Sequence, residues 1–390
     1  MKMTSNGVAG MIDGPVTVLP PAVTAPAESR LGVFESGTPT WRDTAGEPIQ
    51  AHGGGMLEFE GIYYWHGEQR GHGVKPGVRC YSSTDLHRWT PHGVMVEAIG
   101  GEGTDLQPGC IIERPKVVRN AATGKFVMWF HLELAGLKYA AARTAVAVGD
   151  SPIGPFKYLR SYRPHHGVLP VNAPVDGLHE LEVWQARVEL AGDGQEARWA
   201  AGEKFLEDLA VGQMARDMTV FVDGDDVAYH VHASEENRTL HIARLTEDYL
   251  DFSGEYARVL PGGKNEASAV FAHEGRYYML ASGLTGWAPN EARSYVADSM
   301  YGPWESLGNP CVGGPNPHNG IGPEVTFGAQ STHVFEAPGC EGRGRFIAMF
   351  DVWTPGALQE SRYVWLPLTM EGGRPIVRWH DAWDMSVFDA

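Results

Sequence analysis

The sequence predicts an all-β protein, a five-bladed β-propeller with one partly helical insertion. Three observations lead to this prediction. The 390 residues include 49 glycines and 26 prolines, they include twelve tryptophans, and a strand-and-turn unit recurs five times. Five copies of such a unit are what a five-bladed propeller requires. A β-sandwich is the alternative, but it does not explain why the whole unit is repeated.

Each copy of the unit begins with a turn and an aromatic-rich strand that ends in polar residues. The copies are EGIYYWHGE (60–68), GKFVMWFHLE (124–133), DDVAYHVHASEE (225–236), GRYYMLASGLTGW (275–287) and GRFIAMFDVWTP (344–355). A second strand and a turn follow each copy, and two of the turns, DSPIGPF and DSMYGPW, are closely alike. We therefore expect one propeller domain over residues 31–390, preceded by a proline-broken, flexible tail over residues 1–30.

Residues 165–212 interrupt this repeat. The segment GDGQEARWAAGEKFLEDLAVG (192–212) is rich in Ala, Glu, Leu and Lys, which favours a short helix. Long insertions in repeat folds usually lie on one face, often the ligand face. The insertion could therefore border a binding site, form a surface excursion or contact a second copy of the chain.

Three consecutive glycines, Gly53 to Gly55, lead into the first aromatic strand. Because glycine costs backbone entropy, they indicate either a flexible turn or a strand start so crowded that no Cβ fits. His52 precedes them without any metal-ligand pattern. We interpret it as a structural histidine, with a ligand to a central ion or water as the alternative.

The charge and hydropathy of the sequence limit the kinds of molecule that the protein is expected to bind. A net charge of −17 argues against nucleic acid and anionic membranes, which require a basic face, and it suits a neutral ligand. No run of eighteen apolar residues is present, and the N-terminal segment lacks the apolar centre of a signal peptide. We expect a cytoplasmic protein, or a secreted one if a leader has been removed.

Polar residues at the first strand of each blade are expected to converge on the central funnel of a propeller. They are Glu68, Glu113, Asp217, Glu266 and Gln330. The last four lie beside apolar runs, so their surroundings should be partly dry. Acids gathered in such a place shift each other's pKa values, as glycosidic acid catalysis requires. Each of them alone could instead be a structural ion pair.

Tryptophans accompany these acids at matching offsets in four of the repeats. They are Trp65, Trp129, Trp287 and Trp353. Aromatic faces pack against sugar rings while carboxylates bind hydroxyl groups, so the combination indicates a sugar site.

Eight motifs carry a resemblance to a known family: IQAHGGGM, CYSSTDL, ERPKV, VAVGDSPIGPF, RDMTVF, GLTGWAPN, TFGAQST and SRYVWLPL. They resemble glycoside hydrolase family 43, and more narrowly its exo-β-1,3-galactanase branch, over residues 38–384. The resemblance implies a five-bladed propeller that hydrolyses with inversion of anomeric configuration. The fold agrees with the one that the repeats predict.

The resemblance also implies roles for single residues. Glu266 matches the general acid, and Asp217 matches the acid that tunes its pKa. The aspartate base of the wider family should lie near His52, where this chain has none, an absence that the galactanase branch shares. In that branch a glutamine, matched by Gln330, positions the attacking water, with its imidic-acid tautomer as an alternative to the amide. Glu113 matches an acid that contacts sugar and is needed for activity.

A neutral amide is a poor base, so orientation must supply most of the effect of the glutamine. The resemblance places Glu68, Tyr139, Glu236, Asn237 and Thr285 at or near the sugar-binding positions of the branch, and Trp287 is expected to bind sugar as well.

We therefore expect an inverting exo-glycosidase that releases a terminal galactose from oligosaccharides or glycoconjugates. No metal or cofactor is expected in the reaction, although a central structural ion such as calcium would fit the fold. A furanosidase of the same fold (β-galactofuranosidase or α-L-arabinofuranosidase) and a non-catalytic sugar-binding propeller are the alternatives. A phosphorolytic enzyme would need a basic cluster, and the sequence shows only scattered arginines: Arg114, Arg216 and Arg293.

Overall fold

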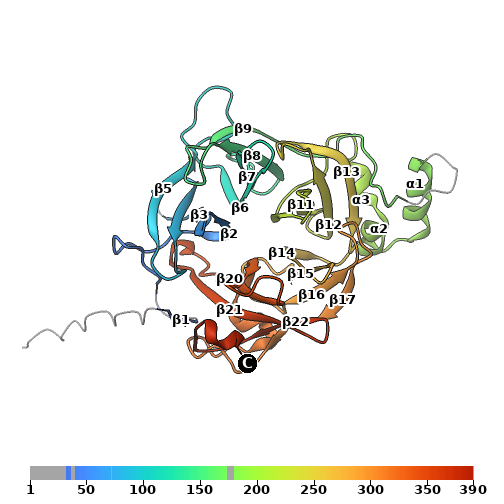
Figure 1. The fold of residues 1–390 in the computed structure, drawn as a ribbon. Coiled ribbons are helices and arrows are strands. Elements are labelled where there is room, and N and C mark those ends of the chain that lie inside the picture. The colour runs from blue at the N-terminus through green and yellow to red at the C-terminus, as the bar shows by residue number, and fades with distance from the viewer. Residues whose placement is uncertain (1–31, 37–39, 72, 174–179, 390) are drawn as a thin grey trace, which may run out of the picture. The chain divides into compact units, whose positions relative to one another are not determined.

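The computed structural model describes residues 32–36, 40–71, 73–173 and 180–389, so the predicted tail over residues 1–30 lies outside it. Five antiparallel sheets surround a central axis as the blades of a propeller (Figure 1). The predicted fold class is therefore confirmed. No helix in the described part of the chain is long and apolar enough to cross a membrane.

Each blade comes from one continuous stretch of sequence, and its four antiparallel strands follow in chain order from the axis outward. Blade I contains β2 (His52–Phe59), β3 (Ile62–Gln69), β4 (Gly77–Ser83) and β5 (Thr90–Glu97). Blade II contains β6 (Ile111–Arg119), β7 (Phe126–Glu133), β8 (Arg143–Gly149) and β9 (Lys157–Tyr162). Blade III contains β10 (Met218–Val222), β11 (Ala228–Ser234), β12 (Thr239–Leu245) and β13 (Phe252–Val259).

Blade IV contains β14 (Asn265–His273), β15 (Arg276–Gly283), β16 (Arg293–Ala297) and β17 (Glu305–Gly308). Blade V contains β19 (Gln330–Glu336), β20 (Arg345–Val352), β21 (Arg362–Glu371) and β22 (Arg374–Arg378), and β18 (Cys311–Val312) adds a parallel edge strand. Short 3₁₀ turns occur at Pro323–Gly328, Leu358–Glu360 and Met385–Phe388.

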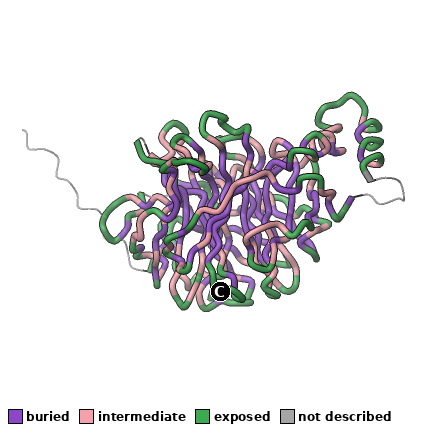
Figure 2. Tube along the Cα trace, turned by 90° about the horizontal axis from the view of Figure 1, so that it is seen from above, coloured by how far each residue is buried: buried purple, intermediate pink, exposed green. Residues whose placement is uncertain are grey.

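The five aromatic-rich repeats form the second strand of each blade: β3, β7, β11, β15 and β20. Their large side chains fill the layers between blades, where alternating residues of neighbouring sheets meet. Seen from the side, buried residues run through the blades and exposed ones gather in the connecting loops (Figure 2). The inner strands β2, β6, β10, β14 and β19 contact one another in a closed ring.

The two ends of the described chain close this ring. β1 (Phe34–Glu35) pairs with β23 (Ala382–Trp383), and the Phe34 ring stacks on Trp383 with centroids 4.3 Å apart. Both rings belong to an aromatic cluster that also contains Trp65 of blade I and Trp365 of blade V. The cluster therefore joins the first blade to the last.

The described part of the interruption over residues 165–212 is partly helical, as the sequence predicts. It contains α1 (Glu180–Leu190), α2 (Gln195–Ala201) and α3 (Glu203–Asp208), which lie beside the outer part of blade III (Figure 1). Trp184 and Phe205 are buried against Tyr256 of β13, and the Arg258 guanidinium lies 4.8 Å from the Trp184 ring. The insertion therefore packs against the outer strand of its blade.

Candidate active site

A pocket of about 240 Å³ lies at the ends of the inner strands. It contains eight of the ten residues predicted for catalysis or sugar binding. Its lining is Glu68, Arg70, Glu113, Arg114, His131, Tyr139, Arg216, Asp217, Asn237, Glu266, Leu284, Gly286, Trp287, Gln330 and Trp353. No described residue of the 165–212 insertion lines the pocket.

A bulge in the inner strand aims the acids of blades II and IV into this pocket. The register of β6 shifts after Glu113, and the register of β14 shifts after Glu266. The next residue in each strand, Arg114 or Ala267, has a left-handed backbone with φ of 54° or 56°. Bulges of this kind redirect side chains beside active sites. The bulge is thus the local reason why these acids converge.

Glu266 is buried, with 8% of its surface exposed, and Asn237 Nδ2 donates a hydrogen bond of 2.7 Å to its Oε1. Burial first, and the negative charge of Asp217 second, raise the pKa of Glu266 to about 8. Its carboxyl group is therefore protonated at neutral pH and able to act as an acid.

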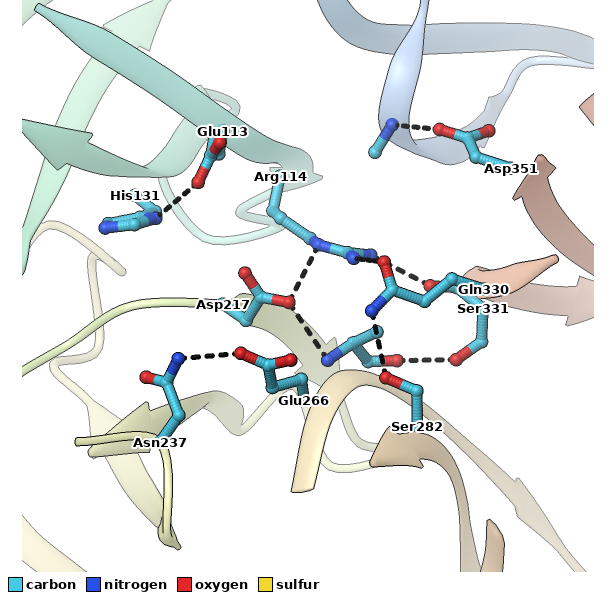
Figure 3. A network of polar contacts seen from close by, with 12 residues as sticks. Glu113, Arg114, His131, Asp217, Asn237, Glu266, Ser282, Gln330, Ser331 and Asp351 are labelled. Carbon is cyan, nitrogen blue, oxygen red and sulfur yellow. Dashed lines mark hydrogen bonds and ion pairs between the residues drawn. The ribbon is translucent and has the colours of Figure 1, made fainter. Parts of the chain in front are cut away.

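Arg114 connects the other polar groups of the pocket (Figure 3). Its Nε lies 3.2 Å from Asp217 Oδ2, and its Nη2 donates a 2.6 Å hydrogen bond to Gln330 Oε1. Asp217 Oδ2 also accepts a 3.1 Å bond from the backbone N–H of Ala267, the residue after Glu266. The guanidinium and the backbone thus hold Asp217 beside the acid.

The amide of Gln330 is fixed on both sides. Arg114 Nη2 and Trp353 Nε1, at 2.6 and 2.8 Å, both donate to Oε1, and Nε2 donates to Ser282 Oγ at 2.9 Å. Arginine and tryptophan are donors only, so the amide oxygen must face them. Ser282 is the cross-strand neighbour of Glu266. Ser282 takes one amide hydrogen, so the second is the one able to hold a water.

Glu113 forms a charged cluster on the other side of the pocket. Its Oε1 accepts from Tyr139 Oη at 2.8 Å and from Arg70 Nη2 at 3.1 Å, and its Oε2 lies 3.1 Å from His131 Nδ1. Burial opposes ionisation, but His131 and Arg70 outweigh it and lower the pKa of Glu113. Burial likewise opposes the charge on His131, but its contacts with Glu113 and Glu133 raise its pKa to about 9. Glu113 is therefore a carboxylate.

Glu68 lines the pocket from the end of the second strand β3 and not from a first strand, so the predicted position on the blade was wrong. Its Oε1 accepts from the backbone N–H of Arg114 at 2.7 Å, and its Oε2 accepts from Arg70 Nε at 2.8 Å. Burial raises the pKa of Glu68, against the charge of Arg70. Both oxygens are thus engaged with the protein.

The glycine triplet belongs to strand β2 and is buried, so it is not a flexible turn. A Cβ on Gly53 would overlap Glu68 Oε1, one on Gly54 the carbonyl of His66, and one on Gly55 the Lys116 side chain. The crowded strand start is confirmed. The atoms that crowd it come from the protein itself.

Beside the triplet lies a buried polar group formed by Asp351 and His52. Asp351 Oδ2 accepts a 2.6 Å hydrogen bond from the Gly53 N–H and lies 3.9 Å from His52 Nδ1. Burial raises the pKa of Asp351 to about 7 and, together with the charge of Arg70, lowers that of His52 to about 3. His52 is therefore neutral. Lys116 Nζ donates to the Gly53 carbonyl at 2.9 Å.

Two residues predicted for sugar binding do not line the pocket. Glu236 pairs with Arg216 at 3.0 Å, and the exposed Thr285 donates to the Ala288 carbonyl at 2.6 Å. Trp65 and Trp129 lie in the core, so their predicted part in a sugar site was wrong. The other two predicted tryptophans, Trp287 and Trp353, do line the pocket, with ring centroids 5.0 Å apart.

Sequence reasoning missed Arg70 and His131, and it treated Arg114 and Arg216 as scattered. Arg70, Arg114 and His131 are each paired with a carboxylate of the pocket, whereas Arg216 pairs with Glu236 outside the pocket lining. Glu113, His131 and Asp217 also present ligand atoms within 4.8 Å of one another, as a metal ion would need. Arg70 and Arg114 already neutralise the two carboxylates of this group, which disfavours a further cation.

Comparison with known proteins gave matches among solved structures, whereas no protein-family model and no curated protein matches the chain. One match is a GH43 β-1,3-galactosidase solved with galactodeoxynojirimycin. It is 46% identical with a TM-score of 0.82, over 90% of this chain and 100% of that one. An exo-β-1,3-galactanase from Clostridium thermocellum is 33% identical with a TM-score of 0.72, over 90% of this chain and 66% of its own.

A third match is an exo-β-1,3-galactanase from Phanerochaete chrysosporium with β-1,3-galactotriose bound. It is 28% identical with a TM-score of 0.70, over 91% of this chain and 69% of its own. The chain thus spans the whole of the galactosidase and about two thirds of each galactanase.

Proposed function

The chain belongs to glycoside hydrolase family 43, and we propose that its pocket releases a terminal β-1,3-linked galactose from oligosaccharides, with inversion at the anomeric carbon. The observation that carries this proposal is the protonated Glu266 beside Asp217 in a small pocket that also contains the fixed amide of Gln330. An acid with a raised pKa and a second group that handles water are the two requirements of an inverting glycosidase.

In the proposed mechanism Glu266 donates its proton to the glycosidic oxygen as the bond to the anomeric carbon breaks. Asp217 keeps that proton on Glu266 before the reaction. Afterwards the new carboxylate is stabilised by the hydrogen bond from Asn237 and by the positive charge of Arg114. The acid returns to its starting state when it takes a proton from solvent.

Water attacks the anomeric carbon from the opposite face of the sugar, and the proton that it loses leaves to solvent, which balances the proton that Glu266 takes back. We propose that Gln330 orients this water through its second amide hydrogen and that the Glu113 carboxylate binds the sugar or the same water. The imidic-acid tautomer would put a hydrogen on Gln330 Oε1, where Arg114 and Trp353 already donate. Losing one of these bonds would cost about 1–3 kcal/mol, so the amide form, which orients the water, is favoured.

The size of the pocket supports exo action. Its volume of about 240 Å³ is below the range of about 300–1,000 Å³ typical of drug-sized ligand sites. Such a pocket suits one terminal sugar better than the interior of a chain. Trp287 and Trp353 supply aromatic surface for the sugar ring.

The decisive experiment is hydrolysis of β-1,3-galactobiose and β-1,3-galactotriose followed by NMR of the first product. We expect α-galactose to appear first and galactotriose to shorten by one sugar at a time, with the Glu266→Gln variant as the inactive control. First formation of the β anomer would contradict inversion.

Hydrolysis of an aryl β-galactofuranoside and an aryl α-arabinofuranoside under the same conditions tests the furanosidase alternative. If only a furanoside is hydrolysed, the enzyme is a furanosidase and not a galactosidase. Binding without turnover of any substrate would indicate a sugar-binding protein.

One further proposal concerns the assembly of the enzyme. We propose self-association through the insertion. Light scattering of the full chain, compared with a variant carrying charged substitutions on the exposed side of α1, tests this proposal.

A further inference from the structure

Three histidines from separate segments meet inside blade III. His232 in β11 and His241 in β12 are direct cross-strand partners, and His165 reaches them from the start of the insertion. All three are buried, and one ring nitrogen of each lies within 4.8 Å of the other two. His165 adopts a left-handed backbone with φ of 61°, a conformation that persists when the surroundings hold it.

Three ring nitrogens, one in each of these histidines, have no hydrogen-bond partner within the described part of the chain. They are His165 Nε2, His232 Nε2 and His241 Nδ1. A buried polar atom without a partner costs about 1–3 kcal/mol, and three in one place need an explanation. A shared ligand between them would satisfy all three together.

The remaining ring nitrogens set the tautomers that such a ligand needs. His241 Nε2 lies 3.1 Å from Glu235 Oε1, so it carries a hydrogen and leaves the lone pair on Nδ1. His232 Nδ1 lies 3.1 Å from His230 Nδ1, and His230 Nε2 lies 3.0 Å from Thr144 Oγ1. When hydrogen is donated along this chain towards Thr144, His232 Nε2 is also left with a lone pair.

Carboxylate–histidine contacts of this type orient metal-binding histidines. The carboxylate of Glu235 is itself fixed by Arg258, whose Nε and Nη2 donate to it at 2.6 and 2.7 Å.

We propose that His165, His232 and His241 bind one divalent transition-metal ion of the zinc class. Neutral imidazole suits zinc and its late first-row neighbours, and three histidine ligands are a known zinc set. The ion would tie the start of the insertion to the β11–β12 hairpin. That hairpin carries Asn237, the hydrogen-bond partner of Glu266, at its tip. The proposed role of the ion is therefore structural, because it would fix the hairpin that positions Asn237 in the pocket.

The test is zinc titration of the untagged full chain after treatment with a chelator, followed by metal analysis of the dialysed protein. We expect one zinc ion per chain and a higher melting temperature when zinc is added back. His232→Gln and His241→Gln should each weaken binding more than about 100-fold, beyond the range typical of outer-shell changes. His66→Gln, which alters a buried histidine of blade I, should leave affinity unchanged.

His165→Ala gives a second route if the strand variants fold poorly, because His165 lies outside the strands. Cobalt titration adds a spectroscopic readout, since a tetrahedral nitrogen site gives visible absorption that the His165→Ala variant should lose. The proposal is overturned if the chelated protein binds no zinc. It is equally overturned if zinc binding survives in His232→Gln and is lost in Glu113→Gln, because the ion would then lie in the pocket.

Discussion

Glu266 is the residue whose protonation decides the chemistry. We predict that Glu266→Gln lowers kcat on β-1,3-galactobiose by about 10²–10⁴-fold, the usual contribution of a general acid. The wild-type kcat/KM should fall as pH rises through about 8, where the carboxyl ionises. A pH–rate profile checks this. An alkaline limit near pH 5 would show that Glu266 is not held protonated.

The same pKa makes a prediction about stability. The folded pKa of Glu266, about 8, lies above its ordinary value of 4.5, so its contribution is fully present below pH 4.5 and is lost as pH rises through 8. Glutamine cannot ionise. The melting temperature of Glu266→Gln, relative to wild type, should therefore increase between pH 5 and pH 9, as thermal scans would show. A variant that becomes relatively less stable with rising pH would contradict the assignment.

Gln330 acts, in our proposal, by holding water and not by accepting its proton. Gln330→Ala should lower kcat by about 10²-fold, the typical effect of a misplaced reactant, while KM changes little. Azide, a strong nucleophile that needs no positioned water, should restore part of the rate and yield an α-galactosyl azide. Full activity of Gln330→Ala without azide would remove the glutamine from the mechanism.

Trp353 offers a finer test because its indole N–H donates to Gln330 Oε1. Trp353→Phe keeps the aromatic ring and loses one neutral hydrogen bond worth about 0.5–1.5 kcal/mol, so kcat should fall by about two- to thirteenfold. Trp287→Phe is the matched control, since Trp287 lies against Trp353 in the same pocket. Steady-state kinetics that show equal losses in both variants would indicate sugar stacking instead.

The sequence predicted the acids of the site but not its arginines, and the difference has a physical reason. Acids beside apolar runs could be recognised because a buried charge needs a purpose or a partner. The arginines could not, since Arg70 and Arg114 bind partners from other strands and blades. Trp65 and Trp129 lie within strands and pack in the core, whereas Trp353 follows the end of β20 and lines the pocket. Position within the second strand of a blade, or beyond the end of that strand, separates the two kinds.

At the scale of elements, the bulged inner strand is the unit that builds the pocket. The registers of β2, β6, β14 and β19 all shift near their starts. A bulge depends on how two strands pair, so the repeats predicted the blades without predicting the bulges. For the same reason Glu68 was placed on the wrong strand, although its convergence on the funnel was foreseen.

Gly53 is the bulge residue of β2, with φ of 56° and no room for a Cβ beside Glu68. Gly53→Ala should cost about 2–5 kcal/mol, from the left-handed backbone and the overlap together, and should lower activity by displacing Glu68. Gly61→Ala is the control, because Gly61 has φ of 75° and open space around it. It should cost about 1–2 kcal/mol with activity kept. Denaturant unfolding measures both, and equal costs would mean that crowding by Glu68 is unimportant.

At the scale of the whole molecule, the ring must be closed so that inner strands from all five blades face one pocket. Each blade is continuous in sequence, so no strand is exchanged between the first and last blades. Closure depends instead on contact between β19 and β2 and on the aromatic cluster that contains Phe34, Trp365 and Trp383. Trp383 Nε1 also donates to the Trp365 carbonyl at 2.9 Å.

We therefore predict that Phe34→Ala and Trp383→Ala each destabilise the protein by about 3–5 kcal/mol. Because the two rings stack, their effects should be coupled by about 0.5–1.5 kcal/mol in a double-mutant cycle measured by denaturant unfolding. Trp304→Ala is the control, since Trp304 is buried in a different cluster, and its effect should add to that of Phe34→Ala. Additivity of Phe34→Ala and Trp383→Ala would mean that the terminal strands stabilise their own blades separately, and the contact between β2 and β19 would then be what closes the ring.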